Sequence, residues 1–95
     1  MKHYTLRKLQ GKNLKTENIL IGLNRKTNLT FKNNTYKNDN TDSLHCKLNF
    51  ESYLELFLPC EENDNFFLTN ELGEDLVQSK SLTDIILFIN KSFKN

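Results

Sequence analysis

The sequence places one histidine directly before one cysteine, His45-Cys46, with another cysteine at Cys60 and another histidine at His3. A cysteine and a histidine in contact can supply a thiolate nucleophile and its base. His45 and Cys46 lie in a stretch with strand periodicity, where successive side chains point to opposite faces of a sheet. We therefore expect that His45 does not activate Cys46 directly. A thiol at Cys60 that meets a histidine in space is the remaining alternative, and the sequence favours a protein that is not an enzyme.

Metal-binding spacings are missing from the sequence. No CxxC or HxxxH pattern occurs, so no zinc site is indicated. Acidic residues cluster at 61–64 and at 71–75, but they lack the alternating ligands and distal glutamate of an EF-hand loop. Charge runs of this kind usually form solvated loops. We expect no metal and no cofactor.

The two cysteines also bear on the cellular compartment. We expect Cys46 and Cys60 to be buried free thiols in a reducing environment, with a Cys46–Cys60 disulfide as the alternative. The first ten residues, MKHYTLRKLQ, lack the apolar region of a signal peptide, and no apolar run approaches the length of a membrane span. These features predict a cytoplasmic protein without membrane contact. Abundant Asn and Lys, with two Arg and no Ala, indicate an AT-rich genome such as that of a phage.

Charge is divided unevenly along the chain. Residues 1–40 hold nine Lys and Arg against two acids, a net of +7, whereas residues 41–95 hold four Lys against ten acids, a net of −6. The overall charge of +1 conceals this asymmetry. A basic surface can bind phosphate backbones or acidic proteins, and aromatic rings beside it can stack on bases. The alternative is that the two halves neutralise each other through cross-strand ion pairs.

The candidate binding residues come from this basic segment and its exposed aromatic ring. They are Arg7, Lys8, Lys12, Lys15, Arg25, Lys26, Lys32, Tyr36 and Lys37.

The length and the apolar residues predict one domain over residues 1–95. Two domains would leave two cores too small to be stable. Sixteen Leu and seven Phe supply the core, and the absence of Ala, the best helix former, argues against a helical bundle.

Apolar and polar residues alternate in most of the chain, which predicts strands. The expected strands are 4–9, 18–24, 28–32, 44–49, 53–58 and 66–69, with a short one at 76–77. We expect 18–24 and 28–32 to pair as a hairpin, 10–17 and 33–42 to be polar loops, and Gly73 to close a turn with positive φ. Residues 50–58 also fit a helix, which remains the alternative there.

One helix is expected near the C-terminus. Its apolar face consists of residues spaced at i, i+3, i+4, i+7 and i+11, widened by two neighbours: Leu82, Ile85, Ile86, Ile89 and Phe93, with Leu87 and Phe88. Ser81 and Asp84 have capping-box spacing, and Lys91 and Lys94 suit the carbonyl end. A buried strand over 85–89 is the competing interpretation.

Together these elements predict an α+β fold: a mostly antiparallel β-sheet of six or seven short strands, covered by one C-terminal helix. A small barrel closed by the helix is the variant. For function we expect a non-enzymatic interaction protein, such as an adaptor, accessory subunit or inhibitor, that docks on a larger protein. Nucleic-acid binding through the basic N-terminal half is the alternative, and an exposed edge strand could also pair two copies into a homodimer.

Overall fold

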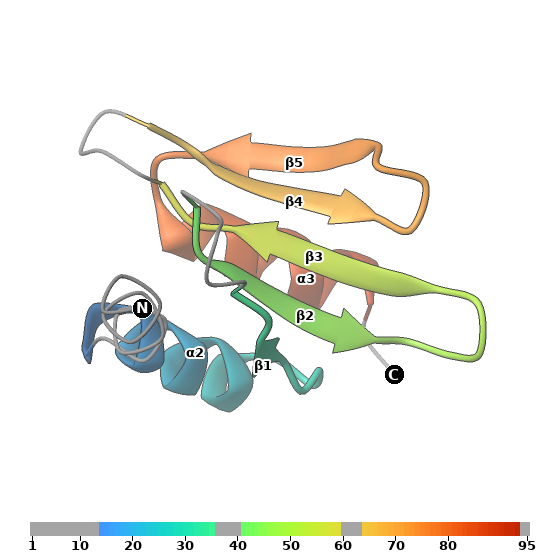
Figure 1. Ribbon diagram of the computed structural model, residues 1–95, viewed down its shortest axis with the longest axis horizontal. Helices are drawn as coiled ribbons and strands as arrows, with labels where there is room; N and C mark the ends of the chain where they lie inside the picture. The colour runs from blue at the N-terminus through green and yellow to red at the C-terminus, as the bar shows by residue number, and fades with distance from the viewer. Residues whose placement is uncertain (1–13, 36–40, 60–63, 94–95) are drawn as a thin grey trace, which may run out of the picture.

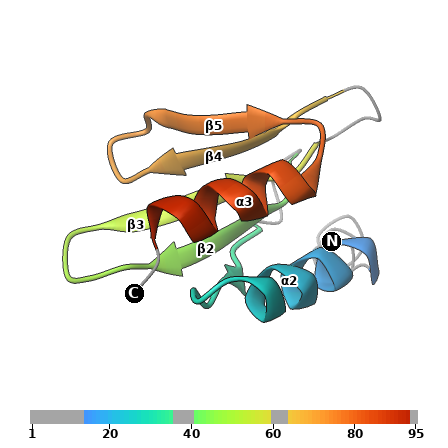
Figure 2. The same cartoon turned by 180° about the vertical axis from the view of Figure 1, so that it is seen from behind.

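The computed structural model describes residues 14–35, 41–59 and 64–93. Its elements run in the order α2 (Leu14–Lys26), β1 (Lys32–Asn33), β2 (Ser43–Lys47), β3 (Tyr53–Phe57), β4 (Phe66–Asn70), β5 (Asp75–Ser79) and α3 (Leu82–Ser92). The strands form one antiparallel sheet in the order β1-β2-β3-β4-β5, and α3 lies across one face (Figures 1 and 2). The predicted α+β fold with a C-terminal helix on an antiparallel sheet is confirmed.

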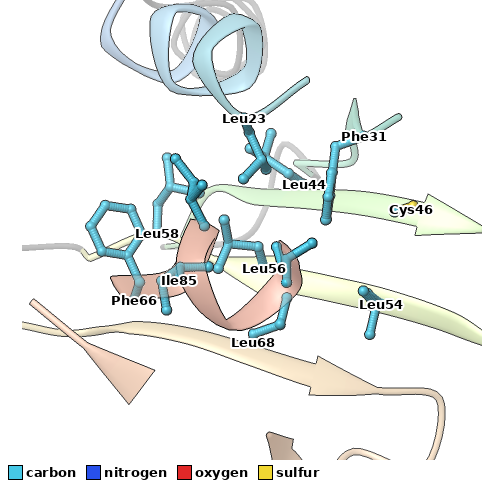
Figure 3. Packing of buried hydrophobic residues seen from close by; sticks show 12 residues of the cluster. Leu23, Phe31, Leu44, Cys46, Leu54, Leu56, Leu58, Phe66, Leu68 and Ile85 are labelled. Carbon is cyan, nitrogen blue, oxygen red and sulfur yellow. The ribbon is translucent and has the colours of Figure 1, made fainter. Parts of the chain in front are cut away.

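The core lies between the sheet and α3, and the strand register builds it. Leu44, Leu56 and Leu68 stand opposite one another on three neighbouring strands, and each is fully buried. Because strand side chains alternate between faces, this row points to the helix side. There it meets a buried face of α3 that consists of Ile85, Ile86 and Ile89. Figure 3 shows the leucines of the three strands converging on Ile85.

The start of α3 differs in detail from the predicted capping box. Ser81 is the N-cap residue, but its side chain makes no capping hydrogen bond. Instead Ser79 Oγ donates to Asp84 Oδ2 at 2.7 Å and accepts the Ser81 N–H at 3.1 Å. The hydroxyl two residues upstream thus organises the first turn. Leu87, expected on the apolar face, is 61% exposed, because the sheet reaches only the side of α3 that carries the three isoleucines.

The largest correction concerns α2. We predicted a polar loop over 10–17 and a strand over 18–24 paired with 28–32, but Leu14–Lys26 is a helix. Ile21 and Leu23 distinguish the two periods: a strand would place both on one face, whereas Ile21 is 49% exposed and Leu23 is 0% exposed. Leu23 enters the core beside Leu44 (Figure 3). Glu17 in the first turn and basic residues in the last turn suit the helix dipole.

The segment after α2 is held by side-chain hydrogen bonds, chiefly those of Asn24, rather than by a hairpin. Asn24 Oδ1 accepts the Phe31 N–H at 2.6 Å, and Asn24 Nδ2 donates to the Phe31 carbonyl at 3.0 Å. This pair of bonds holds Phe31 against the core, where it is 2% exposed. The regular strand that follows, β1, has only two residues.

The strands from 43 onward match the prediction. The expected strands at 44–49, 53–58, 66–69 and 76–77 correspond to β2, β3, β4 and β5, and the helix alternative for 50–58 is wrong. Gly73 has φ +79° and donates its N–H to the Asn70 carbonyl, which closes the β4–β5 turn as predicted. The described strands number five rather than six or seven, and β1 and β5 do not pair, so the sheet is open and the barrel variant is wrong. The expected strand 4–9 lies outside the described residues.

Candidate docking surface on the sheet

The sheet has one face that no described helix or strand covers. Figure 1 shows this face toward the viewer with α3 behind it, and Figure 2 shows α3 in front. Asn90 of α3 donates to the carbonyl of Lys26 at the end of α2 at 2.9 Å, so both helices lie on the other side of the sheet. We call the exposed side the uncovered face. Its side chains alternate with the core residues along the strands: Lys32, Ser43, His45, Lys47, Tyr53, Glu55, Phe57, Phe67, Thr69, Asp75 and Gln78.

A half-buried chain of three polar side chains crosses the middle of the uncovered face. His45 and Glu55 stand directly opposite on β2 and β3, and His45 Nδ1 lies 2.8 Å from Glu55 Oε1. Because a carboxylate only accepts, Nδ1 carries the proton of this bond. Asn34 Nδ2 donates to Glu55 Oε2 at 3.0 Å, so both carboxylate oxygens have partners. Glu55 is 9% exposed, and these bonds offset the desolvation of its charge.

Three aromatic rings lie around these hydrogen-bonded polar side chains. Tyr53 and Phe57 lie at the two ends of β3, each 37% exposed, and Phe67 stands opposite Phe57 on β4 and is half-buried. The Tyr53 ring lies 4.9 Å from the His45 ring, centroid to centroid, at 36°. Large apolar rings on solvent are informative when they gather on one surface. Here they share one face of a ladder whose other side packs on the core, so the hydrogen-bonded strands hold them at fixed positions.

Two shallow hollows lie beside these rings. The aspartate hollow, of about 440 Å³, is lined by Phe57 and Phe67 together with Leu58, Pro59, Asp64 and Asp75. The tyrosine hollow, of about 640 Å³, is lined by Tyr53, Glu55 and Phe57 together with Asn34, Glu71 and Leu72. Phe57 and Thr69 line both, so the two hollows adjoin.

Of the four predicted basic residues that the structure describes, only Lys32 lies on this face. Lys15, Arg25 and Lys26 are exposed along α2, on the helix side of the sheet, while Lys32 on β1 stands opposite His45. Within the described part of the chain, none of these four forms an ion pair. Ion pairing therefore does not neutralise them there. The remaining candidates, Arg7, Lys8, Lys12, Tyr36 and Lys37, lie outside the described residues.

The cysteine and histidine neighbours are separated as the strand pattern predicts. Cys46 is a free thiol buried in the core, whereas His45 points to the uncovered face. Burial raises the pKa of the Cys46 thiol above its ordinary value, and a hydrogen bond with the Thr30 backbone only partly opposes this. A thiol with a raised pKa is a poor nucleophile. Cys60 lies outside the described residues.

The acidic clusters contribute carboxylates to both hollows. Asp64 and Asp75 line the aspartate hollow and Glu71 lines the tyrosine hollow, whereas 61–63 lie outside the described residues. Among residues 14–35, 41–59 and 64–93, no three metal-ligating side chains come together, and no helix there has the length and apolar character needed to cross a membrane.

Sequence reasoning missed the Glu55 partner of His45 and the rings of the uncovered face. The strand pattern contained the signal: if Leu54, Leu56 and Leu58 point inward, the residues between them point outward together. Those residues are Glu55 and Phe57, and Tyr53, directly before Leu54, continues the same alternation.

No protein-family description, curated protein or solved structure matches this chain.

Proposed function

We propose that this protein works by docking on a larger protein through the uncovered face, as a binding partner rather than as an enzyme. The observation that carries the proposal is the exposure of Tyr53, Phe57 and Phe67 on the solvent side of a sheet whose other side is fully packed. Aromatic side chains are enriched in protein interfaces and dominate their binding energy. A rigid sheet presents them with little loss of conformational freedom on binding.

The polar surroundings suit a protein partner better than a nucleic acid at this face. Aromatic rings on a sheet can stack on single-stranded bases. However, among the described residues, all the charged side chains that line the two hollows are carboxylates, from Glu55, Asp64, Glu71 and Asp75. These carboxylates would repel phosphates. The rings therefore support protein docking.

The test compares capture by two matched variants with capture by the unaltered protein. Phe57→Lys puts a charge among the rings of the uncovered face, at a position that lines both hollows, while Leu87→Lys makes a similar change at an exposed position of α3. Each tagged protein is incubated with extract of its host cells and the retained proteins are quantified. Each retained protein is then purified and must bind the unaltered chain directly. We expect at least one protein that binds the unaltered chain and Leu87→Lys but is reduced at least tenfold with Phe57→Lys. Equal capture by all three, or no specific binding protein, would remove the proposal.

Nucleic-acid binding remains a second candidate, at a different surface. It is favoured by Lys15, Arg25 and Lys26, which are exposed along α2 and have no carboxylate partner among the described residues. It predicts retention of single-stranded RNA or duplex DNA in a gel shift at low salt, lost as salt rises. Arg25→Gln with Lys26→Gln should weaken retention, and Lys80→Gln with Lys91→Gln, which removes the same charge elsewhere, should not. No retention at low salt would eliminate this candidate.

A further inference from the structure

We propose that the aspartate hollow binds a lysine or arginine side chain of the partner, with Phe57 and Phe67 against its stem and the Asp75 carboxylate against its charge. This inference rests on docking through the uncovered face and adds the chemistry of the group that is bound. It follows from the charge, the rings and the apolar floor of the hollow.

Among the described residues that line the hollow, the charged side chains are the carboxylates of Asp64 and Asp75. Asp75 is exposed, and within the described part of the chain its carboxylate has no hydrogen bond and no ion pair. A carboxylate beside aromatic rings, without a cation among the described residues, is a suitable counter-charge for a cation supplied from outside.

The rest of the lining suits the apolar part of the same side chains. Lysine and arginine carry three or four methylene groups, which bury readily against apolar surface while the charged end stays near water. Leu58, Pro59 and the two phenylalanine rings provide that surface. An aromatic face also attracts a cation directly. A purely apolar guest would leave the Asp75 carboxylate partly desolvated without compensation.

The opposite margin of the uncovered face carries the opposite charge. Lys32 and Lys47 lie on β1 and β2, both exposed and both without an ion pair among the described residues. The hollow lies instead toward β4 and β5, where Phe67 and Asp75 are found. This gradient would direct the cationic part of a partner to the β4–β5 side and fix its orientation.

A peptide titration followed by 15N–1H NMR spectra tests the inference on the intact chain. The probes are acetyl-Leu-Arg-Leu-amide, its lysine analogue and its norleucine analogue, which keeps the stem and removes the charge. We expect the arginine and lysine peptides to shift the amide signals of Phe57, Phe67, Thr69 and Asp75 at millimolar concentration. Their affinity should exceed that of the norleucine peptide roughly fivefold, the range expected for a partly screened ion pair with a ring contact.

Two variants with the same charge change locate the effect. Asp75→Asn should remove the preference for the cationic peptides, while Glu51→Gln, at the exposed β2–β3 turn outside the lining of the hollow, should retain it. Equal binding of all three peptides, or no shift at these residues, would overturn the inference. Phe57→Lys would still abolish capture of a partner in that case, so docking would survive. If the cationic peptides are not preferred and Phe57→Lys does not reduce capture either, docking through the uncovered face would be removed as well.

Discussion

His45 and Glu55 face each other across β2 and β3, with His45 Nδ1 2.8 Å from Glu55 Oε1, in the middle of the uncovered face. Asn34 supplies the second partner of the carboxylate from the segment after β1. These contacts join three consecutive segments of the sheet through one side chain. The rings of Tyr53 and Phe57 flank that side chain on the same strand, so its bonds help to keep the face in one arrangement.

We expect Glu55→Gln to destabilise the fold by about 1–3 kcal/mol, because the change leaves one buried partner of the carboxylate without its charged acceptor. Urea unfolding measures this change. Glu51→Gln removes the same charge from an exposed turn and should change the free energy of unfolding by less than about 0.5 kcal/mol. Equal effects of the two substitutions would show that the polar chain contributes nothing to stability.

The central position of Leu56 predicts a large loss for Leu56→Ala. The side chain is fully buried between Leu44 and Leu68, and its truncation leaves a cavity that costs about 2–5 kcal/mol. Leu87→Ala deletes the same atoms from a side chain that is 61% exposed and should cost far less. Thermal or urea unfolding distinguishes them, and similar values would place the core elsewhere.

Replacement by alanine should have opposite effects on stability at Gly73 and at Gly22. Gly73 has φ +79°, and a Cβ there would meet no atom within 4 Å. Gly73→Ala should therefore destabilise by about 1 kcal/mol through backbone strain alone. Gly22 lies inside α2 with equally open space, so Gly22→Ala should stabilise by about 0.5–1 kcal/mol. Destabilisation by Gly22→Ala would argue against the helix.

The buried Cys46 thiol predicts a specific dependence on pH. Its pKa is raised in the folded chain by burial, so the unfolded chain loses this proton at lower pH than the folded one. The contribution of this thiol to the free energy of unfolding is therefore fully present below its pKa in the unfolded chain. It is lost as pH rises through its pKa in the folded chain.

In a Cys60→Ser background, iodoacetamide at pH 8 should modify Cys46 slowly in buffer and rapidly in urea. The further change Cys46→Ala should remove the part of the alkaline loss of stability that this thiol causes. Rapid modification of the native chain would mean that the thiol is accessible and ionised.

The C-terminal half could be predicted from sequence because its signals are local and agree with one another. Leu54, Leu56 and Leu58 alternate, Gly73 occupies a turn that needs positive φ, and the isoleucines of α3 repeat at helical spacing. Residues 50–58 and 85–89 each fitted a second type of element, but the alternation of the strands and the spacing of the helix gave the correct one. The α+β class follows from these elements alone.

The N-terminal half was harder because Ile19, Ile21 and Leu23 fit a strand, and Gly22 and the surrounding asparagines weaken a helix prediction. What decides the structure is tertiary: Leu23 fills a place in the core beside Leu44, and Asn90 of α3 binds the last turn of α2. The candidate site was missed for a related reason. The pairing of His45 with Glu55 depends on strand register, which spacing along the chain does not give.

The most direct test of docking through the uncovered face is site-specific photocrosslinking in the host cell. A photoreactive benzoylphenylalanine replaces Phe57 in one variant and Leu87, on exposed α3, in the other. We predict a discrete protein adduct at position 57 that is absent at position 87. Adducts of equal yield at both positions, or adducts at position 87 alone, would contradict the account.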